Sequence, residues 1–245
     1  MLYMRALVIS DIHANLTALE AVLADAPDHD ATWCLGDLVG YGPDPDKCIE
    51  RVRSLPGLLC LIGNHDLAAL KAIPLSRFNS EARAAVTWSG EKLSKDSAAF
   101  LRSLPLKAAY DSFTLAHGSP SQPVWEYVLH EQIAERNFEA FETDYCLVGH
   151  SHLPLLFHRP SSHDLPTLIA PSWSESIPLK PRMILNPGSV GQPRDMDPRA
   201  AYALLDLEAN TWEPRRAEYD IEEVQARMLE AGLPETQATR LSLGW

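Results

Sequence analysis

Five short apolar runs divide the first 150 residues of the chain. They cover residues 6–10, 32–35, 58–62, 113–116 and 145–148. Their length and their β-branched or aromatic content favour buried β-strands over helices. Helical patterns lie between them, first after the capping residue Asn15 and later over 81–104. Because strands alternate with helices, the pattern predicts a layered α/β core.

The pattern changes between residues 154 and 187, where seven of 34 residues are proline. This density predicts an irregular loop on the surface. Further strands are predicted over 183–185, 201–206 and 211–219, and a helix over 221–231. Since no linker is visible, the sequence predicts one domain over residues 1–245, with a proline-rich insertion loop at about 154–187.

The composition excludes several classes of protein. Hydrophobic residues make up 46% of the chain and charged residues 22%, which excludes a disordered, collagen-like or coiled-coil protein. No run approaches the roughly 18 apolar residues of a membrane helix, and the first run meets Asp11 too early for a signal peptide. We therefore expect a cytoplasmic protein that does not act at a membrane.

The net charge limits which binding partners are expected, and the cysteines indicate whether disulfides form. The net charge is −12, from 21 Lys and Arg against 33 Asp and Glu, so long nucleic acid is not an expected partner, because phosphate neutralisation needs clustered cations. A small phosphorylated substrate is compatible if bound metal ions supply positive charge. The cysteines form no C-x-x-C motif and are expected to be buried free thiols. A homo-oligomer stays open.

Each of the five apolar runs is followed by a group that can bind a metal ion. The sequences at these points are S-D-I-H, G-D, G-N-H-D, H-G and G-H-S-H, in chain order. In open α/β sheets ligands bind at the carboxyl ends of strands, so these groups are expected to converge on one rim. Taken singly, each motif is compatible with an ordinary turn or cap. Five in order make coincidence improbable.

The candidate metal ligands share nitrogen or oxygen donors at these strand ends. They are Asp11, His13, Asp37, Asn64, His117, His150 and His152. Seven such donors exceed the needs of one structural zinc ion, but they fit two ions if one carboxylate bridges. Two divalent ions can hold a hydroxide nucleophile and clamp a phosphoryl group, which predicts a hydrolase. Manganese is the expected metal, and the donors also admit iron, zinc, cobalt or nickel.

This ordered set of motifs resembles the calcineurin-like metallophosphoesterase superfamily, and in particular its small prokaryotic phosphodiesterase-like branch. The five motifs of the superfamily span residues 11–152. The branch is indicated by the G-Y-G-P loop at 40–43 and the later N-P-G-S-V-G-Q-P-R segment at 186–194. The resemblance implies a four-layer αββα sandwich of two mixed β-sheets flanked by helices. It also implies two metal sites, one formed by Asp11, His13, Asp37 and His152 and the other by Asp37, Asn64, His117 and His150.

The resemblance further implies catalytic roles for His65 and Asp66. His65 would face the substrate, where an imidazole can donate a proton to the leaving group or steady charge on the phosphoryl oxygens. Asp66 would orient the His65 ring, and the alternative is a solvated loop carboxylate. The remaining histidines lack a strand-end position and are interpreted as surface residues: His29, His130, His158 and His163.

One position departs from the pattern of related classes. Protein serine/threonine phosphatases and symmetrical diadenosine tetraphosphate hydrolases carry an arginine where this chain has Tyr41. Arginine binds phosphate through two hydrogen bonds and tyrosine cannot, so the departure argues against those classes. Arg194 would replace this cation or serve only as a surface or structural residue. We expect hydrolysis of a phosphodiester or a small phosphorylated metabolite by a metal-bridging hydroxide.

Three alternatives stay open at this point. The first is a phosphomonoesterase, a protein phosphatase or a dinucleoside tetraphosphate hydrolase on the same site. The second is a metal-binding module without turnover, against which the complete ligand set and His65 speak. The third is an amidohydrolase-type enzyme on a (β/α)₈ barrel, a fold that usually needs about 250 residues and places ligands out to its last strand.

Overall fold

The computed structural model describes residues 4–245 and contains two six-stranded sheets. The first sheet has the order β3-β2-β1-β11-β12-β9 and the second the order β4-β5-β6-β10-β7-β8. The strands of the first are β1 (Arg5–Ile9), β2 (Ala31–Cys34), β3 (Leu59–Cys60), β9 (Ile177–Pro178), β11 (Ala200–Asp206) and β12 (Thr211–Ala217). Those of the second are β4 (Lys107–Tyr110), β5 (Phe113–Ala116), β6 (Tyr145–Leu147), β7 (Pro154–His158), β8 (Thr167–Ile169) and β10 (Met183–Pro187).

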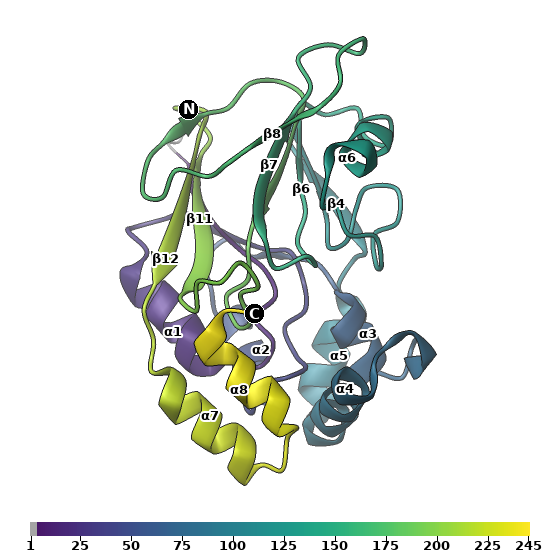
Figure 1. The fold of residues 1–245 in the computed structure, drawn as a ribbon, viewed down its shortest axis with the longest axis vertical. Helices are drawn as coiled ribbons and strands as arrows, with labels where there is room; N and C mark the ends of the chain where they lie inside the picture. The colour runs from purple at the N-terminus through teal and green to yellow at the C-terminus, as the bar shows by residue number, and fades with distance from the viewer. Residues whose placement is uncertain (1–3) are drawn as a thin grey trace.

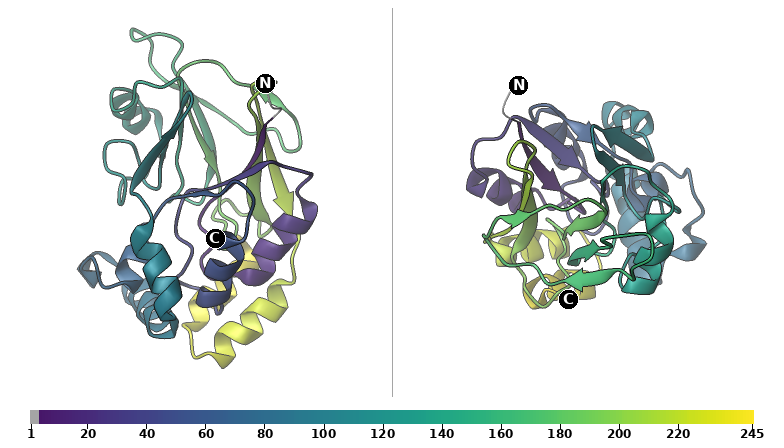
Figure 2. Two further views of the ribbon diagram at one scale, coloured as in Figure 1. Left: turned by 180° about the vertical axis from the view of Figure 1, so that it is seen from behind. Right: turned by 90° about the horizontal axis from the view of Figure 1, so that it is seen from above.

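Both sheets are mixed, and helices flank them. Strand β1 is parallel to β2 and antiparallel to β11, while β10 is parallel to β6 and antiparallel to β7. The helices are α1 (Leu16–Asp25), α2 (Pro45–Arg53), α3 (Asn64–Ala69), α4 (Ser80–Lys92), α5 (Lys95–Ser103), α6 (Glu131–Phe138), α7 (Ile221–Glu230) and α8 (Glu235–Leu243). Most of them gather in one half of the molecule, whereas α6 lies beside the second sheet (Figures 1 and 2). The predicted pair of mixed, helix-flanked sheets is confirmed, and the (β/α)₈ barrel is wrong.

Three apolar interfaces hold these layers together. Successive side chains of a strand point to opposite faces, so Ala6 and Val8 of β1 pack between the sheets. Their neighbours Leu7 and Ile9 pack on the other face, against the helices. On the second sheet, Ile184 packs outward in a cluster that includes residues of α6. Strands buried on both faces explain why the sequence shows continuous apolar runs.

Two predictions about secondary structure are wrong in part. The single helix expected over 81–104 is two helices, α4 and α5, because the chain is extended at Leu93 and Ser94 begins a new helix by accepting a hydrogen bond from the Ser97 N–H. The segment 154–187 is not all loop, since it contains β7, β8, β9 and β10. Proline is tolerated there because Pro154 begins its strand and Pro178 lies in an edge strand.

Some boundaries also differ from expectation. The strand expected over 58–62 contains only Leu59–Cys60, and that over 211–219 ends at Ala217. Among residues 4–245, no helix combines the length and the apolar character that a bilayer-crossing segment requires.

Candidate metal centre

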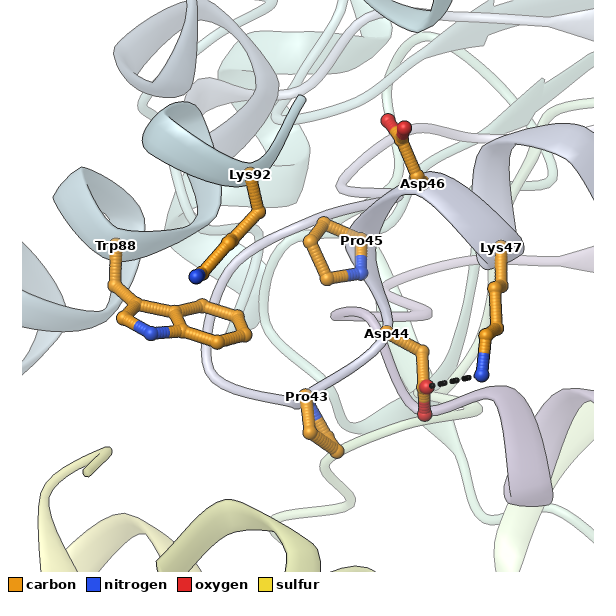
Figure 3. A pocket seen from close by; sticks show the side chains of 7 residues that line it. All are labelled: Pro43, Asp44, Pro45, Asp46, Lys47, Trp88 and Lys92. Atoms are coloured by element: carbon orange, nitrogen blue, oxygen red, sulfur yellow. Dashed lines mark ion pairs between the residues drawn. The ribbon is translucent and has the colours of Figure 1, made fainter. Parts of the chain in front are cut away.

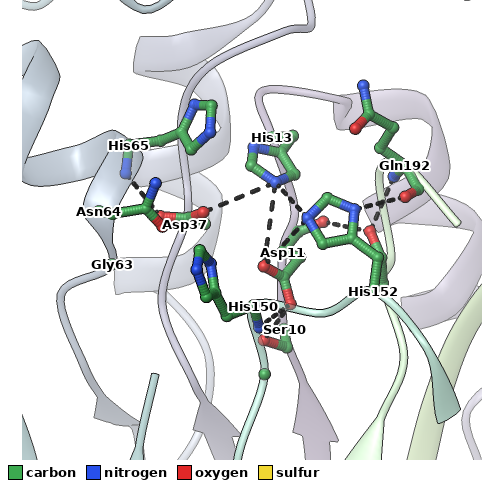
Figure 4. A network of polar contacts seen from close by, with 12 residues as sticks. Ser10, Asp11, His13, Asp37, Gly63, Asn64, His65, His150, His152 and Gln192 are labelled. Atoms are coloured by element: carbon green, nitrogen blue, oxygen red, sulfur yellow. Dashed lines mark hydrogen bonds and ion pairs between the residues drawn. The ribbon is translucent and has the colours of Figure 1, made fainter. Parts of the chain in front are cut away.

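The structure brings all nine predicted site residues into one buried cluster. Figure 4 labels all of them except Asp66 and His117. Those from the first sheet follow β1, β2 and β3, and those from the second follow β5 and β6. Every one of the nine is at most 4% exposed. The cluster therefore lies where the carboxyl ends of strands from both sheets meet.

Asp11, His13 and His152 form the first group of converging ligand atoms. The Nε2 atom of His152 lies 3.4 Å from Oδ1 of Asp11 and 3.0 Å from Nε2 of His13. The Nε2 atom of His13 also lies 3.7 Å from Oδ2 of Asp37. Two imidazoles and two carboxylates thus face one point, which is a donor set suited to a divalent transition metal.

Asp37, His117 and His150 form the second group. The Nε2 atom of His117 lies 3.4 Å from Oδ2 of Asp37 and 3.0 Å from Oδ1 of Asn64. The same Asp37 oxygen therefore faces both groups. A carboxylate in this position can bridge two ions.

Hydrogen bonds of the Nδ1 atoms fix the orientation of three of the histidine rings. The Nδ1 atoms of His13, His117 and His152 bond to the backbone carbonyls of Val39, Leu35 and Gln192, respectively. A carbonyl only accepts, so Nδ1 carries the hydrogen, and Nε2 of a neutral ring presents a lone pair. Lone pairs of His13 and His152 then face each other at 3.0 Å. This arrangement repels unless a cation lies beside both atoms.

Unpartnered buried atoms point to the same two positions. Oδ1 of Asp11, Oδ2 of Asp37 and Nε2 of His150 are buried without a hydrogen-bond partner. An unsatisfied buried polar group costs about 1–3 kcal/mol, and more when it is charged. Since two divalent cations would satisfy all three atoms, the residues present fit a pair of metal ions.

The pKa values of the cluster reflect burial and mutual charge. Burial raises the pKa of Asp11 to about 7. Burial also acts to raise the pKa of Asp37, but the charges of His117 and His65 outweigh it and hold that pKa well below its usual range. Burial opposes protonation of His117, but the Asp37 carboxylate raises its pKa to about 9. Metal binding would release this proton, because a ligating imidazole must be neutral.

Backbone strain is concentrated at the same residues. Five of the predicted ligands have positive φ angles between 49° and 63°: Asp11, His13, Asp37, His150 and His152. For residues other than glycine this left-handed conformation costs of order 1–3 kcal/mol. Backbone hydrogen bonds hold the strained turns, including those from Asp11 N to Gly36 O and from His13 N to Asp37 O.

Close packing also explains two glycines of the motifs. A β-carbon at Gly63 would overlap Oδ1 of Asp37, and one at Gly149 would overlap the Ser10 hydroxyl. Glycine is required at these points because the backbone itself approaches the ligands.

His65 lies beside the predicted ligands, with its ring among other aromatic rings (Figure 4). The ring lies edge-on to His13, with centroids 4.8 Å apart, and 4.6 Å from Tyr41. Within residues 4–245 the ring nitrogens form no hydrogen bond, and the backbone N–H donates to Oδ1 of Asp37. Burial lowers the pKa of His65 to about 4, so the ring is neutral at pH 7. Nδ1 is buried against Gly40, so Nε2 is the ring nitrogen that is free to serve a bound substrate.

Asp66 contacts the backbone and not the His65 ring. Its carboxylate accepts hydrogen bonds from the N–H groups of Asp37, Val39 and Gly63 at 2.9, 3.1 and 2.9 Å. The prediction that Asp66 orients His65 therefore has no supporting bond in the structure. The alternative of a solvated carboxylate is wrong, because Asp66 is fully buried. Asp66 is a positioning residue that fastens the strained loop carrying Asp37 to the start of α3.

Replacement of Asp66 by alanine should lower the free energy of unfolding by about 3 kcal/mol or more, because three buried N–H groups would lose their acceptor. Asp66→Asn retains one oxygen and should lose less. Urea unfolding of the metal-free proteins measures both changes. A variant Asp66→Ala as stable as the parent would show that the three bonds contribute little.

Three residues near the cluster were not found from the sequence. The Ser10 hydroxyl donates to Oδ2 of Asp11 at 2.6 Å. Tyr127 stacks on His150, with centroids 4.0 Å apart and an interplanar angle of 3°. Gln192 accepts from His152 through its backbone and from Arg194 through its side chain. Tyr127 and Gln192 lie in irregular segments, so periodicity carried no signal for them, whereas the position of Ser10 at a strand end could have marked it.

Arg194 lies close to the cluster. Burial lowers the pKa of His152, and the charge of Arg194 lowers it further. The Nε atom of Arg194 is buried without a hydrogen-bond partner.

The four histidines interpreted as surface residues take no part in the cluster.

A separate cavity of about 310 Å³ lies beside the loop that follows Tyr41 (Figure 3). Its walls are Pro43, Asp44, Pro45, Asp46, Lys47, Trp88 and Lys92. Lys47 is paired with Asp44 at 3.6 Å. None of the predicted site residues lines this cavity.

Comparison with known proteins places these features in a family context. A model of the calcineurin-like phosphoesterase superfamily domain matches residues 4–210. The crystal structure of a metallophosphoesterase from Sphaerobacter thermophilus is 46% identical, with a TM-score of 0.91 and 100% of both chains covered. An uncharacterised protein of Methanocaldococcus jannaschii is 35% identical over 245 residues, 97% of each chain.

A third similarity is local. The symmetrical bis(5'-nucleosyl)-tetraphosphatase of Yersinia enterocolitica is 43% identical over 67 residues, which are 26% of this chain and 23% of that protein.

Proposed function

This chain belongs to the calcineurin-like phosphoesterase superfamily and is a metal-dependent phosphoric ester hydrolase, and we propose that it hydrolyses phosphodiesters with two divalent ions. The observation that carries the proposal is Oδ2 of Asp37, which is buried, unpartnered and shared by the two groups of ligand atoms. When bound, two ions would supply a hydroxide nucleophile and neutralise phosphoryl charge.

Each residue of the cluster has a proposed role in binding the metal ions or the substrate. Asp11, His13, Asp37 and His152 would hold one ion, and Asp37, Asn64, His117 and His150 the other, in line with the distances between their donor atoms. His65 would donate a hydrogen bond to an oxygen of the phosphate. Asp66 would keep the Asp37 loop in its strained conformation. We propose manganese as the metal, since nitrogen and oxygen donors suit it.

Two arginines support an anionic substrate in a protein of net charge −12. Burial raises the pKa of Tyr41, and the charges of Arg194 and Arg240 oppose that increase, so both guanidinium groups lie near this ring. Tyr41 in turn contacts His13 and His65. Within the described chain neither arginine forms an ion pair with a carboxylate. Arg194 donates to Oε1 of Gln192, and Arg240 donates to Oε1 of Gln237 and to the backbone oxygen of Trp245. These bonds leave the positive charges in place, and those charges favour an anionic substrate.

A dinucleoside tetraphosphate hydrolase is the second candidate. The local similarity to the Yersinia tetraphosphatase favours it. Tyr41, which stands in place of the arginine of that class, argues against it. We also propose a reducing compartment such as the cytoplasm, because all four cysteines are buried free thiols.

The two candidates are separated by activity on matched esters. With manganese bound, we expect kcat/KM for bis(p-nitrophenyl) phosphate to equal or exceed that for p-nitrophenyl phosphate. An extra guanidinium stabilises a bound monoester dianion more than a diester monoanion, so a site without one loses part of its advantage for monoesters. A charge-assisted hydrogen bond of about 1.5–3 kcal/mol corresponds to roughly 10- to 100-fold in rate. A cyclic nucleotide and a diadenosine tetraphosphate complete the series.

Arg194→Ala is the variant that controls this comparison. Replacement of Arg194 should lower monoester hydrolysis more than diester hydrolysis, because Arg194 supplies positive charge near Tyr41, where the related classes carry an arginine. A strong monoester preference that survives Arg194→Ala contradicts the diesterase proposal. Metal-loaded protein that hydrolyses none of the esters would indicate a binding module.

A further inference from the structure

Aromatic side chains continue outward from the metal centre along two loops. Phe78, directly after the short 3-10 helix Leu75–Arg77, lies edge-on to His65 at 5.1 Å and contacts Trp125 at 5.3 Å. The guanidinium of Arg77 lies over the Trp125 ring at 4.6 Å. Tyr127 stacks on His150. We call Arg77, Phe78, Trp125 and Tyr127 the aromatic shelf.

The loop that carries Trp125 and Tyr127 is held in place by the residue between them. Oε2 of Glu126 accepts hydrogen bonds from the Ser119 hydroxyl and the Asn137 side-chain amide, both at 2.7 Å. Asn137 belongs to α6, so the loop is tied to a helix of the sandwich. Because these bonds fix the loop to its neighbours, they hold the shelf in place, which lowers the entropic cost of binding.

Tyr127 stacks on a candidate metal ligand and is also partly exposed. Its ring is parallel to the His150 ring at 4.0 Å, yet the residue remains 41% exposed. Tyr127 therefore combines a contact with a candidate metal ligand with surface that remains open to solvent. Because His150 belongs to the second group of ligand atoms, the Tyr127 ring lies directly beside the candidate metal centre.

The side chains of the aromatic shelf favour a ligand that contains a flat aromatic ring. Aromatic rings prefer offset-stacked or edge-to-face partners, and a guanidinium stacks on planar π-systems. An acyl chain would need a deep apolar groove, and the shelf offers flat ring faces instead. Arg77 is exposed and, among the ion pairs of residues 4–245, has no carboxylate partner.

We propose that the aromatic shelf binds a planar aromatic substituent of the phosphoester, such as a nucleobase, with Tyr127 as the main stacking surface. This inference rests on the proposed phosphodiesterase function. It makes the substrate class a phosphodiester that carries at least one flat aromatic or heteroaromatic group.

Three phosphonates test the inference without hydrolysis, since their C–P bond resists the enzyme. They are compared at a pH above the second pKa of all three, so that each is a dianion. Phenylphosphonate is flat, cyclohexylphosphonate is equally apolar but not flat, and ethylphosphonate is small. Calorimetry with manganese-loaded protein should show phenylphosphonate binding about threefold to tenfold more tightly than both others. Equal affinities for the phenyl and cyclohexyl compounds overturn the inference.

Variants at position 127 complete the test. Tyr127→Leu should reduce the phenyl preference to near one, and Tyr127→Phe should keep it. Tyr110→Leu is the matched control, because Tyr110 is 40% exposed and lies on β4, outside the shelf. Elemental analysis of each variant reports whether His150 still holds its ion, and a metal loss would weaken all three phosphonates together without changing their ratio.

The outcomes separate the two proposals. If all three phosphonates bind equally and diesters are hydrolysed, the shelf inference fails while the proposed function stands. If no phosphonate binds and no ester is hydrolysed, the proposed function itself fails. A phenyl preference that persists in Tyr127→Leu overturns the role of Tyr127.

Discussion

Asp37→Ala should lose both bound metal ions and roughly 10⁴-fold or more of the turnover of phosphodiesters. The reason is that Oδ2 of Asp37 lies 3.7 Å from the His13 ligand atom and 3.4 Å from that of His117, so it belongs to both groups of ligand atoms. If each ion contributes about 3 kcal/mol of transition-state stabilisation, the loss of two gives about 6 kcal/mol, or slightly more than four powers of ten.

The measurement is metal content by elemental analysis, together with kcat on a diester, and circular dichroism as a check of folding. The parent should hold close to two divalent ions per chain. Asp37→Asn keeps an oxygen for the hydrogen bond from His65 N, so it separates the loss of bridging charge from a disturbed loop. It should still bind the ions poorly.

Asp11→Ala is the informative comparison, because Asp11 belongs to one of the two groups only. This variant should retain the ion held by Asp37, Asn64, His117 and His150. A parent protein that holds a single ion, or an Asp37→Ala protein that keeps two, would refute the bridging role of Asp37.

His65→Asn should lower turnover roughly 10²- to 10⁴-fold, the usual range for losing a group that transfers or stabilises a proton in the transition state. The His65 ring lies among His13, Tyr41 and Phe78 and forms no hydrogen bond within residues 4–245. Because burial lowers its pKa to about 4, the ring is suited to donating a hydrogen bond to a phosphoryl oxygen as a neutral group.

The same variant should keep its metal content at the level of the parent, since the His65 ring is outside the proposed ligand set. His163→Asn, at an exposed position, is the control and should leave turnover unchanged. A His65→Asn protein that loses metal would make His65 a ligand. Full activity on a substrate with a poor leaving group would remove its catalytic role.

The sequence predicted the layered fold and the residues of the cluster because both depend on local order along the chain. Interior strands need continuous apolar runs, and groups that leave a strand end must follow it directly in the sequence. The runs before Asp11, Asp37 and Asn64 therefore marked the positions of these residues. The resemblance to a family added the second sheet and the division of ligands between two ions.

Other features were not predictable, since they depend on which segments meet in space. The strands within 154–187 exist because sheet edges accept prolines, and the break between α4 and α5 depends on a single capping serine. The partners of Asp66 are N–H groups as much as 29 residues away. The stacking of Tyr127 on His150 joins two loops of the second sheet.

The sequence by itself determined the five predicted strands of the first 150 residues, the seven candidate ligands and the class of chemistry, because donor type and position after a strand are local properties. The roles of His65 and Asp66 came from the resemblance. Only the tertiary structure decided the shared position of Asp37 Oδ2, the role of Asp66 as a backbone acceptor and the proximity of Arg194 and Tyr127. These are distances between atoms far apart in the chain, and they are set by how the two sheets pack against each other and against their helices.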